Sequence, residues 1–197
     1  MTASKTTRQL TLTAMFIALV ALLGLTPLGI IPLGFINVTI LHIPVIIGAL
    51  VLGPKGGLVL GCTFGLVSTL RAFGIPLPAS ALVSNLMAES PPLVVVMSML
   101  PRLLVPLTSC GVCRLLERRG ARRSASLAAS AVAGALTNTI FYLGLMLLFY
   151  TLTALDATAV LGLIAGTGAL GGGAEAVVAA LVVTPVVLAL EKIQKRK

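Results

Sequence analysis

Long apolar stretches without charge, separated by short clusters of basic residues, constrain the fold of this chain more than any other feature of its sequence. Only 10% of its 197 residues are charged, whereas a soluble domain has about 25%. Because a soluble fold of this length could not bury so much apolar surface, these stretches must lie in lipid. The pattern predicts an all-α integral membrane protein in which residues 1–197 form a single transmembrane domain.

We expect a bundle of six transmembrane helices, with bounds near 10–30, 38–53, 57–73, 92–116, 125–150 and 168–190. The second and third are short for a hydrocarbon core of about 30 Å, so they should be tilted or set deep in the bundle. Gly57, Gly61 and Gly65 form a tandem GxxxG on the third helix, and this spacing permits close helix packing.

The basic residues predict how the bundle lies in the membrane. If the segments alternate in direction, 12 of the 14 Lys and Arg residues fall on one side, in four clusters: Lys5 and Arg8; Lys55; Arg114, Arg118, Arg119, Arg122 and Arg123; Lys192, Lys195, Arg196 and Lys197. The positive-inside rule makes that side the cytoplasm, so both termini should be cytoplasmic. Basic residues placed in this way indicate a lipid bilayer as partner, and not nucleic acid.

Five polar side chains from different segments are expected at a similar depth in the outer half of the membrane. With a helical rise of about 1.5 Å per residue, Arg102 lies roughly 18 Å and His42 roughly 20 Å from the inner boundary. The same estimate gives roughly 22 Å for Asn138, 24 Å for Arg71 and 25 Å for Glu175. Polar groups at that depth are costly unless they face each other or a cavity. The shared depth predicts one polar pocket that opens to the outside.

Each of these residues also has a structural alternative. His42 could cap a helix, Arg71 could reach the outer headgroups, and Asn138 could join two helices. Arg102 needs an anionic partner, which could be Glu175 or a ligand.

Enzymatic chemistry finds little support in the sequence. The stretch "GPKGG" lacks the spacing of a phosphate-binding P-loop, so we expect no ATPase site. Cys110 and Cys113 form a CxxC without a thioredoxin-like pattern around it, and we expect them to be packing residues. A single histidine and the lack of an acidic cluster predict no metal site, no cofactor and no catalytic residues. A membrane-embedded enzyme acting on lipid, or an assembly subunit that oligomerises through its glycine faces, remain the alternatives to transport.

Several stretches resemble one protein family along nearly the whole chain: "AMFIALVALL", "INVTILHIPVIIGALVLGPKGGLVLGCTFGLVSTLRAF", "PRLLVPLTSCGVC", "ALTNTIFYLG" and "AEAVVAALVVTPVVLALEK". In these stretches the chain resembles the substrate-binding S components of energy-coupling-factor (ECF) vitamin transporters, and within them the pantothenate-type members. The resemblance implies a protein of the bacterial cytoplasmic membrane that captures a vitamin from outside. It also implies docking on a transmembrane T component, which carries two cytoplasmic ATPases that use the ATP.

The resemblance further implies roles for individual residues. Ala14 and Ala18, an AxxxA on the first helix, would form the docking surface, and residues 29–39 and 74–90 would cover the pocket. Arg102 would pair with the carboxylate of pantothenate. The other expected ligand-binding residues are Asn37, Thr39, His42, Arg71, Asn85, Asn138, Tyr142 and Glu175. Because the chain has no Trp to stack on a ring, a riboflavin- or thiamin-like ligand is disfavoured, although another water-soluble vitamin or small metabolite stays an alternative.

Overall fold

The computed structural model describes residues 2–32, 37–76 and 79–195. Its elements, in chain order, are α1 (Thr2–Leu25), the 3-10 turn η1 (Pro27–Gly29), β1 (Ile30–Pro32), β2 (Asn37–Thr39), α2 (His42–Ala72), α3 (Ala81–Glu89), α4 (Pro91–Arg118), α5 (Arg123–Leu152), α6 (Thr158–Leu163), the π-helical turn η2 (Ile164–Gly168) and α7 (Ala169–Lys195). Within the described residues, five helices are long and apolar enough to cross a membrane, and these are α1, α2, α4, α5 and α7. The expected helical membrane fold is therefore confirmed at this level.

A short hairpin replaces part of the first two predicted helices. The first helix was expected to run to about residue 30, but α1 ends at Leu25, and Pro27 begins a 3-10 turn. Strands β1 and β2 then pair antiparallel, with Ile30 opposite Thr39. This hairpin is an exception to the all-α prediction. Its physical reason is local, because β-branched residues between Pro and Gly favour extended backbone over helix.

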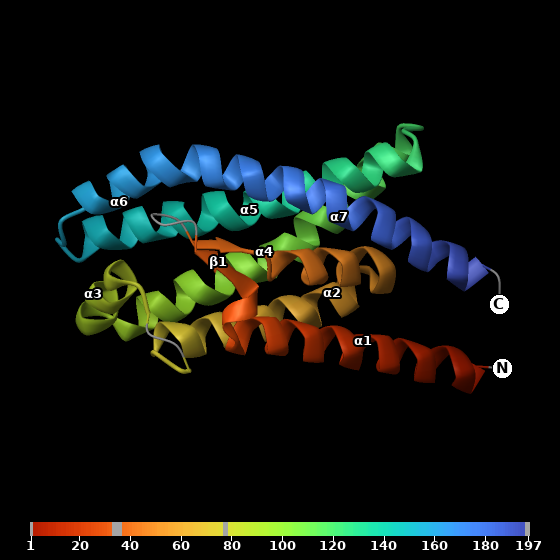
Figure 1. Cartoon of the computed structure of the whole chain (residues 1–197), viewed down its shortest axis with the longest axis horizontal. Coiled ribbons are helices and arrows are strands. Elements are labelled where there is room, and N and C mark those ends of the chain that lie inside the picture. Colours follow the sequence, from red (N-terminus) through yellow and green to blue (C-terminus); the bar gives the residue numbers. More distant parts are fainter. Residues whose placement is uncertain (1, 33–36, 77–78, 196–197) are drawn as a thin grey trace.

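Helix α2 contains both the second and the third predicted segments. Gly53 has φ +82° and interrupts the helical backbone, and Pro54 follows it. The halves on either side fold back on each other, since a Cβ added at Gly57 would lie 2.7 Å from the Cβ of Ala49. In a continuous helix those two residues would be about 12 Å apart. Figure 1 shows the orange first half running toward the turn and the second half running back.

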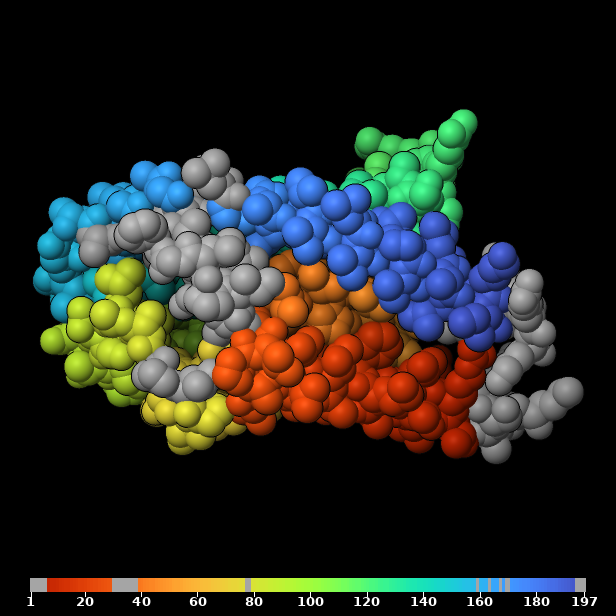
Figure 2. Space-filling view, in the orientation of Figure 1, coloured from red at the N-terminus to blue at the C-terminus, as the bar shows by residue number. Residues whose placement is uncertain are grey.

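The first half of α2 is the innermost part of the fold, as expected for a short segment. Every residue from His42 to Ala49 is buried. Figure 2 shows this orange half between α1 and α7, which cover it on two sides.

The second half of α2 packs on α4 through the tandem GxxxG. A Cβ at Gly57 would lie 2.9 Å from Pro106, one at Gly61 2.6 Å from the carbonyl oxygen of Arg102, and one at Gly65 2.6 Å from Met99. The glycine face is therefore occupied by α4 within the same chain. An assembly subunit that oligomerises through these glycines does not fit this packing.

The basic connections gather at one end of the molecule. In Figure 1 both termini, the turn of α2 and the connection from α4 to α5 lie at the same end. At this end Arg123 on α5 forms ion pairs with Glu117 on α4 and with Glu191 on α7. Helices α3 and α6 lie toward the opposite end, within stretches that the sequence predicted only as connections.

Candidate functional site

The guanidinium of Arg102 is the centre of the candidate site. Arg102 lies on α4, and its side chain is only 8% exposed. The guanidinium carbon lies 4.4 Å from the ring centroid of Tyr142 on α5 and 5.3 Å from that of Phe64 on α2. Stacking on aromatic faces stabilises a guanidinium and fixes its plane. Two aromatic rings from two helices therefore orient this cation.

The local sequence of α4 supplies a hydrogen-bond acceptor for Arg102. In a regular helix the carbonyl of Met97 would accept from the N–H of residue 101, but residue 101 is proline and has no N–H. Nη1 of Arg102 donates to this carbonyl at 3.0 Å. Nε of Arg102 is buried and has no hydrogen-bond partner. The guanidinium thus keeps donor capacity for a further acceptor.

His42 and Asn138 present further unpaired polar atoms. The Oδ1 atom of Asn138 and both ring nitrogens of His42 are buried without a well-formed hydrogen bond, although the Thr39 backbone interacts with the imidazole. The two residues lie at one level, as the packing of their antiparallel helices shows. A Cβ at Gly134 on α5 would lie 2.9 Å from Ile46 on α2. Asn138 on α5 and His42 on α2 each lie one helical turn from that contact, toward the end of the molecule opposite the two termini.

Glu175 on α7 makes two hydrogen bonds instead of an ion pair. Its Oε1 accepts from the backbone N–H of Thr39 at 3.0 Å, and its Oε2 accepts from the hydroxyl of Thr139 at 3.3 Å. Among the described residues, ion pairs within 4.0 Å involve Arg123 only. Glu175 and Arg102 therefore form no direct ion pair in this structure, although the two charges are close enough to interact electrostatically.

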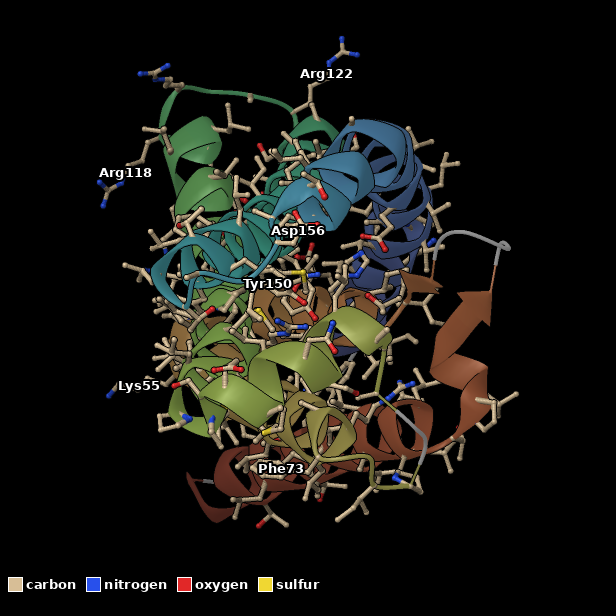
Figure 3. The ribbon with its side chains drawn as sticks, turned by 90° about the vertical axis from the view of Figure 1, so that its left-hand side faces the viewer. Lys55, Phe73, Arg118, Arg122, Tyr150 and Asp156 are labelled. Atoms are coloured by element: carbon tan, nitrogen blue, oxygen red, sulfur yellow. The ribbon has the colours of Figure 1, made fainter. Side chains whose placement is uncertain are left out.

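Two predicted ligand-binding residues, Arg71 and Asn85, make no hydrogen bond to this cluster among the described residues, and the side chain of a third is not described. Arg71 is half-buried at the end of α2, and its side chain makes no hydrogen bond or ion pair within the described part of the chain. Asn85 is exposed on α3 and approaches the hydroxyl of Tyr150. That hydroxyl donates to the carbonyl of Leu82 at 2.6 Å, and Figure 3 shows Tyr150 beside α3. The side chain of Asn37 lies outside the described residues.

Two residues of the cluster were not expected from the sequence. Phe64 lies one helical turn beyond Gly61, on the face that packs on α4, so the GxxxG pattern carried a signal for it. Thr139 follows Asn138 directly, and nothing in its sequence neighbourhood marks it as a partner of Glu175.

The cluster is suited to hold an anionic polar ligand. It offers one oriented guanidinium with a free donor, one amide oxygen that can accept, and a buried imidazole whose ring nitrogens make no well-formed hydrogen bond. A buried cation without a carboxylate partner is costly, and an anionic ligand would compensate it.

Comparison with known proteins gives two matches. Residues 8–187 match the family model described as ECF transporter, substrate-specific component. The chain is also 32% identical over 156 residues to the pantothenic acid transporter PanT of Lactococcus lactis subsp. cremoris (strain MG1363), and the match covers 76% of each protein.

Proposed function

This chain belongs to the family of substrate-specific components of ECF transporters, and we propose that it captures pantothenate for import. Family membership and five apolar helices make it a multi-pass protein of a bacterial membrane and a transporter subunit. Energy would come from partners, namely a transmembrane T component and two cytoplasmic ATPases.

The buried guanidinium of Arg102 is the observation that supports pantothenate most directly. Pantothenate carries one carboxylate, and the free Nε of Arg102 together with its Nη groups can donate two parallel hydrogen bonds to such a group. The similar PanT protein is named for this acid. The carboxylate would stabilise a charge that otherwise lies in the bundle without an ion-pair partner.

Asn138 and His42 would bind the remaining polar groups of the ligand. Pantothenate has an amide and two hydroxyl groups, and its N–H or a hydroxyl could donate to Oδ1 of Asn138. His42 could accept or donate through the ring nitrogen that does not face the Thr39 backbone. Together with Arg102 these residues would distinguish pantothenate from vitamins that lack a carboxylate.

We also propose six membrane crossings with both termini in the cytoplasm. The reversal at Gly53 would divide α2 into two crossings, and the basic connections at one end support a cytoplasmic position for that end. The face of α1 that carries Ala14 and Ala18 would dock on the T component. Both alanines are exposed, whereas Phe16 and Val20 on the other face pack toward α2.

A thermal-shift assay of the purified protein against a panel of water-soluble vitamins tests the ligand. Pantothenate at 100 times its Kd should stabilise the protein by about 2.7 kcal/mol, which corresponds to roughly 5–10 °C in Tm. Thiamin and riboflavin are the matched negative controls. Stabilisation by another vitamin but not by pantothenate would refute the ligand assignment.

Co-purification with the T component and the ATPases tests the transport role separately. A protein that responds to pantothenate but does not assemble with these subunits would contradict the import mechanism and leave the ligand assignment intact.

A further inference from the structure

The carboxylate of Glu175 connects three parts of the chain. It lies on α7, is 9% exposed, and accepts hydrogen bonds from β2 through the Thr39 backbone and from α5 through the Thr139 hydroxyl. Both donors are uncharged. Each carboxylate oxygen thus accepts one hydrogen bond from the protein itself. This leaves Glu175 less capacity to accept hydrogen bonds from a ligand.

The hydrogen bond to Thr39 closes the open edge of the hairpin. The N–H of Ile40 donates to the carbonyl of Gly29 at 3.2 Å, on the side where β1 begins. Since consecutive N–H groups of a strand point in opposite directions, the N–H of Thr39 points away from β1. Glu175 supplies the acceptor there, in place of a third strand.

The position of Thr39 determines how the chain enters α2. The first turn begins directly after it, with the N–H of Ile43 donating to the carbonyl of Ile40 at 3.1 Å. His42 is three residues beyond Thr39, and the Thr39 backbone also interacts with the imidazole. A displacement of β2 would therefore displace His42 in the ligand site.

Close packing of α5 on α7 allows the hydrogen bond between Thr139 and Glu175. A Cβ at Gly172, one turn before Glu175, would lie 3.0 Å from Cγ2 of Thr139. The glycine lets Thr139 approach α7 closely enough for its hydroxyl to reach the carboxylate.

We propose that Glu175 is a positioning residue, which holds strand β2 against α5 and α7 and so fixes His42 in the ligand site without contacting the ligand itself. This deepens the proposed function, and only its binding readout rests on that function.

Four variants separate the positioning role from a ligand contact. Glu175→Ala removes both hydrogen bonds, and Thr139→Val removes one of them. Glu175→Gln keeps an acceptor for Thr39 and gains an N–H₂ that can donate to Thr139, while the charge is lost. Thr184→Val on the same helix is the control, because the Thr184 hydroxyl is buried without a partner.

The first measurement is hydrogen–deuterium exchange at the Thr39 amide in ligand-free protein. We expect exchange to be about tenfold faster in Glu175→Ala, since an amide that loses its hydrogen bond also loses protection. Thr139→Val should give a smaller increase, and Glu175→Gln and Thr184→Val should exchange like the wild type. Unchanged exchange in Glu175→Ala would overturn the proposal whatever the ligand is.

The second measurement is the Kd for pantothenate. Glu175→Ala should weaken binding by about tenfold or more, in line with the loss of hydrogen bonds to a charged group. Glu175→Gln should stay within about threefold of the wild type, a difference under 1 kcal/mol. If Glu175→Gln loses as much affinity as Glu175→Ala, the carboxylate acts on the ligand and the positioning role is refuted. If the wild type itself binds no pantothenate, the proposed ligand is wrong, and the exchange data alone decide the role of Glu175.

Discussion

Replacing Arg102 by alanine should weaken pantothenate binding more than any other single change in the site. The guanidinium is 8% exposed and has no carboxylate partner among the described residues, so the ligand carboxylate would be its counter-ion. Removing one partner of a buried hydrogen-bonded charge pair costs about 2–5 kcal/mol, which is roughly 30-fold to several thousand-fold in Kd.

Arg102→Lys should give an intermediate loss of affinity. An ammonium keeps the charge but cannot stack between Phe64 and Tyr142 or donate two parallel hydrogen bonds. The loss of one hydrogen bond to the charged carboxylate costs about 1.5–3 kcal/mol, or roughly 10-fold to 150-fold in Kd. The second hydrogen bond and the charge should thus appear as separate steps in the series from arginine through lysine to alanine.

Isothermal titration calorimetry measures these Kd values, and Arg71→Ala is the matched control. Arg71 is an arginine at a similar predicted depth whose side chain makes no hydrogen bond or ion pair within the described residues, so its removal should leave the Kd unchanged. The Tm of each ligand-free variant must be measured as well, because a destabilised protein can imitate a lost contact. Wild-type affinity in Arg102→Ala would refute the role of Arg102 as carboxylate partner.

Three further predictions concern the histidine, the docking face and the topology. His42→Gln should retain part of the affinity for pantothenate, and His42→Leu should lose at least about tenfold in affinity, because only Gln can hydrogen-bond the ligand. Normal Kd values with a lowered Tm in both variants would instead show that His42 is purely structural. Trp in place of Ala14 or Ala18 should abolish uptake while the isolated protein binds normally, and loss of both would contradict a docking role. In a cysteine-free background of intact cells, an impermeant thiol reagent should label a cysteine at Thr158 and not one at Ser124; the reverse labelling would invert the proposed orientation.

The level of the polar residues along the bundle could be predicted, because helix rise is regular. Counting residues from the basic clusters placed Arg102, His42, Asn138 and Glu175 in one layer, and the structure brings these four together through Tyr142, Thr39 and Thr139. The same count placed Arg71 in the layer, yet it stays outside the cluster.

Counting residues from the basic clusters does not predict the direction in which each side chain points around its helix. Two residues at equal depth can face the bundle or the lipid, and the choice depends on tertiary packing. The expectation of a covering loop over residues 74–90 was wrong in part, because 81–89 form helix α3, which presents Asn85 to Tyr150. The hydrogen-bond partners of Glu175 likewise depend on how α5 and the hairpin pack against α7, which no local pattern encodes.

The contact between α1 and α2 joins the helix of the proposed docking face to the start of α2, where His42 lies. A Cβ at Gly24 would lie 2.2 Å from Val67 and 2.8 Å from Leu41, the residue before His42, so only glycine allows this approach. Ala14 and Ala18 lie on the exposed side of the same helix, two to three turns toward the N-terminus. A partner that binds the alanine face would therefore touch α1 from outside, while Leu41, the neighbour of His42, packs on a different side of this helix. The alanine face and the face of α1 that packs on α2 share no residue. A bulky residue at Ala18 should therefore block docking on the T component and leave the Kd of the isolated protein for pantothenate unchanged.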